Sequence, residues 1–116
     1  MEIKISRERL VERFLRYVSV DTQSDPQSET FPSTAKQLTL LNLLLEEMLA
    51  LGLSDAEIDP HGYVTGTVPA TPGHEGKPVI GLISHVDTSP DMAGAGVKPQ
   101  LSLIHISEPT RLDVIS

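Results

Sequence analysis

The feature that most constrains this chain is a continuous apolar run at residues 79–83, Val-Ile-Gly-Leu-Ile, in a sequence of only 116 residues. Apolar and polar positions do not alternate in it, which is typical of a β-strand covered on both faces. A chain of this length buries only about two thirds of the surface of its unfolded state, so it has few layers with which to cover such a strand. The run therefore predicts a layered α/β fold. It also predicts poor solubility for the isolated chain, because its apolar surface lacks partners.

Two segments ahead of this run predict helices. In residues 6–18 apolar side chains recur at helical spacing, and Ser6 is a candidate N-cap. A second, Leu-rich helix is expected to begin around residues 32–34, where cap-type residues stand, and to end at Gly52. Its apolar positions spread beyond one stripe, which indicates cover on more than one side. Packing on the core of the protein explains the apolar faces of both helices more simply than binding to a membrane or to a partner does.

Turn-forming residues separate these helices from two short strands. Residues 21–32 are rich in Ser, Asp, Thr, Gln and Pro and predict a loop. Residues 56–59 and 63–68 flank a Pro-His-Gly turn and predict a β-hairpin. Residues 69–78, rich in Pro and Gly, predict an exposed loop. Two helices, a hairpin and a buried strand in this order predict an α/β fold with an incomplete mixed sheet.

Charge and composition exclude several classes of protein. Nine Lys and Arg against sixteen Asp and Glu give a net charge of −7, which argues against a nucleic-acid partner. The absence of Cys excludes disulfides, thiolate zinc sites and cysteine nucleophiles. No apolar run approaches the roughly 20 residues of a membrane helix, and residues 1–9 lack the apolar core of a signal peptide. We expect a cytoplasmic protein without a membrane partner, and no pattern indicates its oligomeric state.

The chemical signal stands where the apolar run ends, in the sequence Ser-His-Val-Asp-Thr-Ser-Pro-Asp of residues 84–91. Catalytic groups of open α/β sheets gather at the carboxyl ends of strands, and His85 and Asp87 would point to the same side of an extended backbone. A neutral imidazole can bind a metal while a carboxylate fixes its tautomer. A His-x-Asp pattern also arises often by chance, and zinc needs three or four ligands. The motif alone leaves both interpretations open, whereas His61 and His74 are expected to face solvent.

Three blocks of the sequence carry a resemblance to a known family. Residues 14–24, 32–34 and 81–91 resemble, in order and spacing, the peptidase T family, the tripeptide aminopeptidases among the M20 zinc metallopeptidases. The similarity covers nearly all of residues 7–100. The last block is the most specific, because other M20 hydrolases usually share only its His-x-Asp core.

The resemblance implies a hydrolase that uses two zinc ions. His85 would be a metal ligand of one zinc, and Asp87 the catalytic carboxylate that orients it. The reaction would be hydrolysis of the N-terminal peptide bond of a tripeptide, with a metal-bridging water as nucleophile and a Glu as general base. In the family the other ligands, the base and a lid domain lie downstream of these blocks. We therefore expect residues 1–100 to be the N-terminal portion of the catalytic domain and to be inactive alone.

The resemblance stops at Leu101. Residues 101–111 match, codon for codon, the translation of a transposase-type sequencing adapter, which predicts that residues 101–116 are a non-native tail and not part of the fold. His105 is accordingly not counted as a metal ligand. Two other functions stay open. One is a different M20 hydrolase, such as a dipeptidase or an N-acyl-amino-acid deacylase, and the other is a small non-catalytic binding protein.

Overall fold

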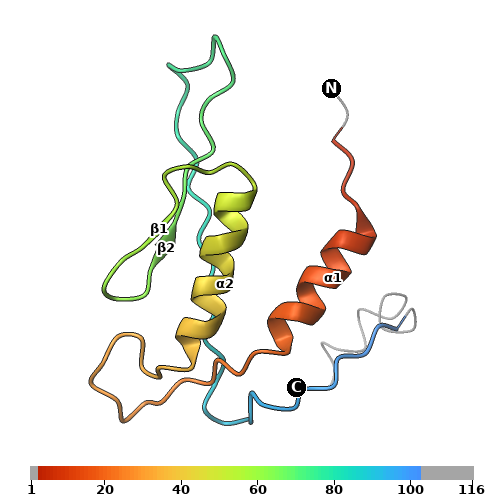
Figure 1. Cartoon of the computed structure of the whole chain (residues 1–116), viewed down its shortest axis with the longest axis vertical. Coiled ribbons are helices and arrows are strands. Elements are labelled where there is room, and N and C mark those ends of the chain that lie inside the picture. Colours follow the sequence, from red (N-terminus) through yellow and green to blue (C-terminus); the bar gives the residue numbers. More distant parts are fainter. Residues whose placement is uncertain (1–2, 103–116) are drawn as a thin grey trace, which may run out of the picture.

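The computed structural model describes residues 3–102, which form two helices and one two-stranded sheet. The elements in chain order are α1 (Arg7–Val18), α2 (Gln37–Ala50), β1 (Glu57–Ile58) and β2 (Val64–Thr65). The strands are antiparallel and the hairpin packs against α2 (Figure 1). Beyond β2 a long loop leaves the helices before the chain returns toward the beginning of α2. The predicted α/β class is confirmed in this coarse form. None of the helices in residues 3–102 has the length and apolar character to cross a membrane.

Helix α1 begins where its sequence predicts. The Ser6 hydroxyl accepts the Arg9 N–H at 3.3 Å, which satisfies one of the free amides of the first turn. The helix lacks the packing that its apolar stripe predicts, since none of its residues is buried and Leu10 and Phe14 are 60% and 44% exposed. Polar contacts between its arginines and Glu47 of α2 join the two helices instead.

Helix α2 ends as predicted, at a glycine in the left-handed region. Gly52 has a φ of +97°, and its N–H donates to the Leu49 carbonyl at 3.0 Å. The Leu53 N–H donates to the Met48 carbonyl, also at 3.0 Å. This pair of bonds is the Schellman motif, which satisfies carbonyls that the helix itself leaves free.

The beginning of α2 differs from the prediction. The helix starts at Gln37, and its N-cap residue Lys36 makes no side-chain capping bond. Ser33 and Thr34 do not cap the helix, because their hydroxyl oxygens accept hydrogen bonds from the Gln37 side-chain amide at 3.1 and 3.0 Å. A hydroxyl group that is engaged by the Gln37 side chain is not available to the free amides of the first turn.

The hairpin turn is held from within and packs on α2. The Asp59 Oδ1 atom accepts the N–H groups of His61 and Tyr63 at 2.9 and 2.8 Å. Gly62 has a φ of +86°, and a Cβ atom there would lie 3.2 Å from a methyl group of Leu41. Glycine is therefore favoured both by the backbone conformation and by the space available. Leu41 and its neighbour Leu40 are the buried apolar residues of the described chain.

The prediction of a buried strand at residues 79–83 is wrong for this chain. Within residues 3–102 no strand pairs with this segment, and its Val, Ile and Leu side chains are 83–99% exposed. The physical reason is the lack of neighbours, since an extended apolar segment becomes a buried strand only where other layers cover it. The tail interpreted as adapter-derived lies, apart from Leu101 and Ser102, outside the described residues.

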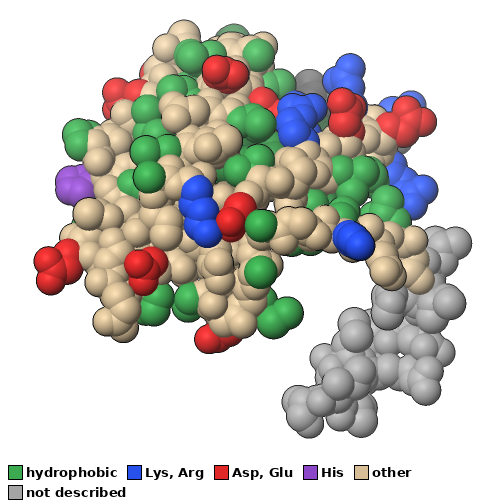
Figure 2. Space-filling model, turned by 60° about the horizontal axis from the view of Figure 1, so that its bottom comes forward, with side chains coloured by type: hydrophobic (Ala, Val, Ile, Leu, Met, Phe, Trp, Pro, Cys, Tyr) green, Lys and Arg blue, Asp and Glu red, His purple; other side chains and the backbone are tan. Residues whose placement is uncertain are grey.

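The molecule as a whole is open. Its radius of gyration is 17.5 Å, against about 13 Å for a compact domain of 100 residues. Figure 2 shows apolar side chains distributed over the visible surface among the polar ones. The fold therefore positions its functional residues through hydrogen bonds more than through a hydrophobic core.

Candidate metal-binding site

His85 and Asp87 come together as their spacing predicts. The Nδ1 atom of His85 lies 3.0 Å from the Asp87 Oδ1 atom and 2.9 Å from the Asp87 carbonyl oxygen. Both side chains are accessible, with exposed fractions of 84% and 48%. The two groups therefore form a pair at the surface, in the segment that follows the apolar run.

The neighbours of Nδ1 fix the tautomer of His85. A carboxylate oxygen and a carbonyl oxygen are both acceptors, so the neutral ring makes these contacts only with its proton on Nδ1. The lone pair is then on Nε2, in a ring that is mostly exposed to solvent. This is the arrangement in which a carboxylate orients a metal-binding imidazole. The pair fits the role of one metal ligand and its orienting group.

The described residues do not supply a complete set of metal ligands. Within residues 3–102 no group of three or more His, Asp or Glu side chains is placed so that it could hold a metal ion. The other two histidines of this part of the chain, His61 and His74, are exposed and lie in turns, as predicted. The ring of His61 contacts those of Phe31 and Tyr63, each with 6.4 Å between ring centroids.

A loop from the N-terminal part of the chain docks on the backbone of the His-Val-Asp motif. The Thr22 hydroxyl donates to the Val86 carbonyl at 2.7 Å, and the Thr88 N–H donates to the Thr22 carbonyl at 3.1 Å. The Ser24 N–H donates to the Thr88 carbonyl at 2.9 Å. Gln23 and Thr88 form a parallel β-bridge at the centre of this contact. Thr22, at 3% exposure, is more buried than Leu40 or Leu41.

This contact was not predicted by residue patterns, which assigned residues 21–24 and 33–34 to loop and cap roles. The resemblance offered one signal, because its first two blocks contain these same residues. Thr34 donates its hydroxyl hydrogen to the Gln23 carbonyl at 2.8 Å and accepts from the buried Gln37 amide at 3.0 Å. A chain of hydrogen bonds thus runs from the first turn of α2 to the segment that carries His85.

An ion pair holds the beginning of the same loop. The Asp21 carboxylate accepts from Lys36 Nζ at 2.9 Å and from the Gln23 N–H at 3.0 Å. The hydrogen bond from Lys36, aided by the Gln23 N–H, keeps the pKa of Asp21 below its ordinary value of 3.8. A Cβ atom at Gly94 would lie 2.5 Å from the Asp21 Oδ1 atom, so any side chain there would displace this carboxylate.

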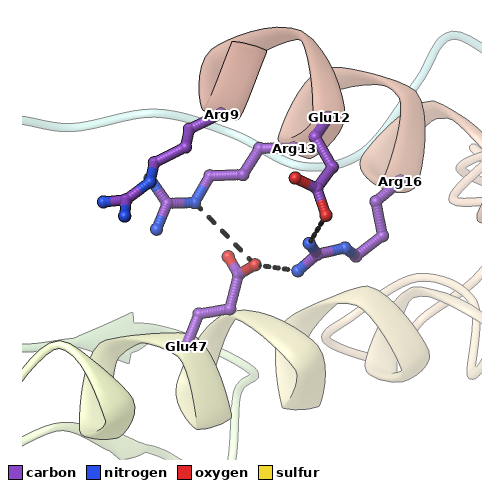
Figure 3. A pocket seen from close by; sticks show the side chains of 5 residues that line it. All are labelled: Arg9, Glu12, Arg13, Arg16 and Glu47. Atoms are coloured by element: carbon purple, nitrogen blue, oxygen red, sulfur yellow. Dashed lines mark hydrogen bonds and ion pairs between the residues drawn. The ribbon is translucent and has the colours of Figure 1, made fainter. Parts of the chain in front are cut away.

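A polar cleft of about 220 Å³ lies between the helices, away from His85 (Figure 3). The side chains that line it are those of Arg9, Glu12, Arg13, Arg16 and Glu47. Glu47 is bonded to Arg16 and to the Tyr17 hydroxyl, and its Oε1 atom lies 3.9 Å from Arg13 Nε. Burial and the hydrogen bond to Glu47 raise the pKa of Tyr17 above 10.0. The ion pairs of Glu47 with Arg13 and Arg16 link the two helices across this cleft.

Comparison with known proteins finds relatives that share one name, Peptidase T. No family model matches the chain. It is 53% identical over 93 residues to Peptidase T of Alkaliphilus oremlandii, 50% over 95 residues to that of Geobacillus kaustophilus, and 55% over 92 residues to that of Desulfitobacterium hafniense strain Y51. These matches cover 79%, 82% and 79% of this chain, but only 22–23% of each relative. The chain thus spans less than a quarter of the length of the curated relatives it matches.

The α/β fold and the His85–Asp87 pair are consistent with part of a peptidase domain, the class to which these relatives belong by name. Over about four fifths of its length, the chain is similar in sequence to proteins named Peptidase T. The matched lengths of 92–95 residues agree with the extent of the resemblance found in the sequence.

Proposed function

We propose that this chain is the N-terminal part of a metal-dependent tripeptide aminopeptidase. The observation that carries the proposal is 46–55% identity over 92–95 residues to proteins named Peptidase T. The geometry of His85 and Asp87 supports it, because the pair presents an oriented, accessible imidazole nitrogen. In the proposal residues 1–100 belong to the catalytic domain, and residues 101–116 are a non-native tail.

The proposed cofactor is zinc, two ions per active site, with His85 as a ligand of one of them. A bound zinc would supply a Lewis acid and a water of lowered pKa. In this chain Asp87 holds the proton of the His85 ring at Nδ1 and keeps Nε2 directed away from the backbone contact. In the proposal, the described residues supply one ligand and its orienting group, later parts of the complete enzyme supply the other ligands, and residues 1–100 alone are inactive. We place the complete enzyme in the cytoplasm, with short peptides as its substrates.

The extent of the reading frame is the first test of the proposal. Amplifying and resequencing the source DNA across the codons for Gln100 and Leu101 is expected to give a frame that continues well beyond residue 116. The recovered protein is expected to release the N-terminal residue of a tripeptide faster than it hydrolyses a dipeptide or an N-acetyl amino acid. A preference for either of the last two substrates would indicate another M20 hydrolase. A genomic tail identical to residues 101–116 would contradict the proposal.

Substitutions in the recovered protein test the two site residues. His85→Ala is expected to abolish tripeptide hydrolysis and zinc retention at one site, because a first ligand is lost. Asp87→Asn is expected to weaken zinc affinity about 10- to 100-fold, as removal of a metal-ligand's orienting partner does. His74→Ala, which changes an exposed loop histidine, is the matched control and is expected to leave both properties unchanged. Equal effects of His85→Ala and His74→Ala would show that His85 is not a metal ligand.

A further inference from the structure

We infer that Thr22 is a positioning residue for the metal-binding pair. The inference rests on the proposed function and extends it to a loop more than 60 residues away in the sequence. Thr22 contacts the backbone on both sides of Asp87, through the Val86 carbonyl and the Thr88 N–H. Neither contact touches the imidazole or the carboxylate, so Thr22 acts through the backbone that carries them.

The bonds of Thr22 fix the peptide units from which the pair projects. Val86 stands between His85 and Asp87, and its carbonyl oxygen receives the Thr22 hydroxyl hydrogen at 2.7 Å. The 3.0 Å contact between His85 Nδ1 and Asp87 Oδ1 lies near the middle of the range for a hydrogen bond. A small rotation of the Val86 or Asp87 peptide unit would lengthen it beyond that range. Anchoring these units therefore preserves the orientation of the metal-binding ring.

The burial of Thr22 strengthens the argument. In a chain whose side chains are mostly accessible, Thr22 is only 3% exposed. Its hydroxyl is thus shielded from water that would otherwise compete for the Val86 carbonyl. The loop has further anchors, since the Gln23 amide donates to the Pro90 and Met92 carbonyls at 2.9 and 3.0 Å. Thr34 and the buried Gln37 hold it from the other side.

The test uses full-length hybrids, in which residues 7–100 of this chain replace the matching segment of Peptidase T from Geobacillus kaustophilus or Desulfitobacterium hafniense. Two hosts are used so that one poorly folded hybrid does not end the experiment. Thr22→Val removes the hydroxyl and keeps the shape, Thr22→Ser keeps the hydroxyl, and Thr30→Val is the control. The Thr30 hydroxyl donates to the Pro32 carbonyl at 2.9 Å, in an exposed part of the loop.

The main readout is zinc affinity, measured by competition with a chromophoric chelator and independent of activity. We expect Thr22→Val to weaken it about 10-fold, at the lower end of the effects seen for outer partners of metal ligands. Thr22→Ser and Thr30→Val are expected to stay within about two-fold of the parent hybrid. For tripeptide hydrolysis, kcat of Thr22→Val is expected to fall at limiting zinc and to recover at saturating zinc, with KM unchanged.

The outcomes separate the inference from the proposed function. If Thr22→Val lowers only the melting temperature and leaves zinc affinity unchanged, Thr22 is merely structural and the inference is wrong. If the parent hybrids bind no zinc, or His85→Ala binds it as tightly as they do, the proposed function fails and the inference fails with it. If Thr22→Val does not fold in either host, Thr22→Ala replaces it, because it also removes the hydroxyl bond to the Val86 carbonyl and places a smaller side chain at the buried position. An unchanged zinc affinity in that variant would overturn the inference.

Discussion

Single residues of this chain are buried where they connect one segment to another. Among residues 3–102 the buried polar side chains are those of Thr22 and Gln37, and both belong to the hydrogen-bonded path that ends at the His85–Asp87 segment. Each has its polar atoms paired, as burial requires. Their position explains how a chain with a small core can still hold two surface side chains in a defined orientation.

Acidification is expected to loosen the loop that carries Thr22. The pKa of Asp21 is lowered in the folded chain by its hydrogen bond to Lys36. The ion pair therefore stabilises the fold at pH values above 3.8, and this stabilisation is lost as the pH falls through the lowered pKa. Urea unfolding should give a higher midpoint for the parent chain than for Asp21→Asn near neutral pH. This difference is expected to shrink and then disappear as the pH falls below 3.8 and through the lowered pKa of Asp21.

A double-mutant cycle provides the control for this pH dependence. In a Lys36→Met background the Asp21→Asn substitution has lost its main partner, so its effect on the urea midpoint should be smaller at neutral pH. The remaining effect belongs to the Gln23 N–H, which also donates to Asp21. A difference of the same size at every pH would show that the ion pair does not stabilise the loop.

At the scale of elements, two of the predicted helix ends are confirmed, whereas the predicted start of α2 and the predicted packing of α1 are wrong. Ser6 caps α1 and Gly52 ends α2, as each was predicted to do. Helix α2 begins at Gln37, later than predicted, because Ser33 and Thr34 are engaged by the Gln37 side chain. Helix α1 formed as predicted but is joined to α2 by Glu47, because its apolar stripe has no layer to pack against within the described residues.

Replacing the glycine that ends α2 tests the Schellman motif. Gly52→Ala is expected to lower the free energy of unfolding by about 1 kcal/mol, because a side chain disfavours the left-handed conformation. No atom lies within 4 Å of the added Cβ, so the effect comes from the backbone alone. Gly76→Ala is the matched control, since that position is also open and its φ lies outside the left-handed region. Urea unfolding followed by circular dichroism measures both, and equal effects would contradict the assignment.

At the scale of the whole molecule, exposed apolar surface is the dominant property. The segment of residues 79–83 carries side chains that are 83–99% exposed, next to the site that it leads into. We expect the isolated chain to associate through this segment, because extended apolar segments with free backbone groups pair with one another. In the complete enzyme proposed above, later parts of the sequence would supply the cover.

A single charge placed in the segment tests this expectation. Leu82→Lys is expected to shift the isolated chain toward the monomer in sedimentation velocity experiments. Val68→Lys adds the same charge at an isolated apolar side chain that is 78% exposed, compared with 94% for Leu82, and should change the distribution little. A parent chain that sediments as a monomer at all concentrations would contradict the prediction, as would equal effects of the two substitutions.

The sequence by itself determined the properties that depend on near neighbours. Helical spacing, the cap at Ser6, the stop at Gly52 and the two-residue spacing of His85 and Asp87 are all set within a few residues. Contacts between distant segments were decided only by the tertiary structure. The docking of Thr22 on Val86 joins residues 64 positions apart, and no local pattern encodes such a pairing. The exposure of residues 79–83 has the same origin, because burial depends on which layers are present to cover a segment.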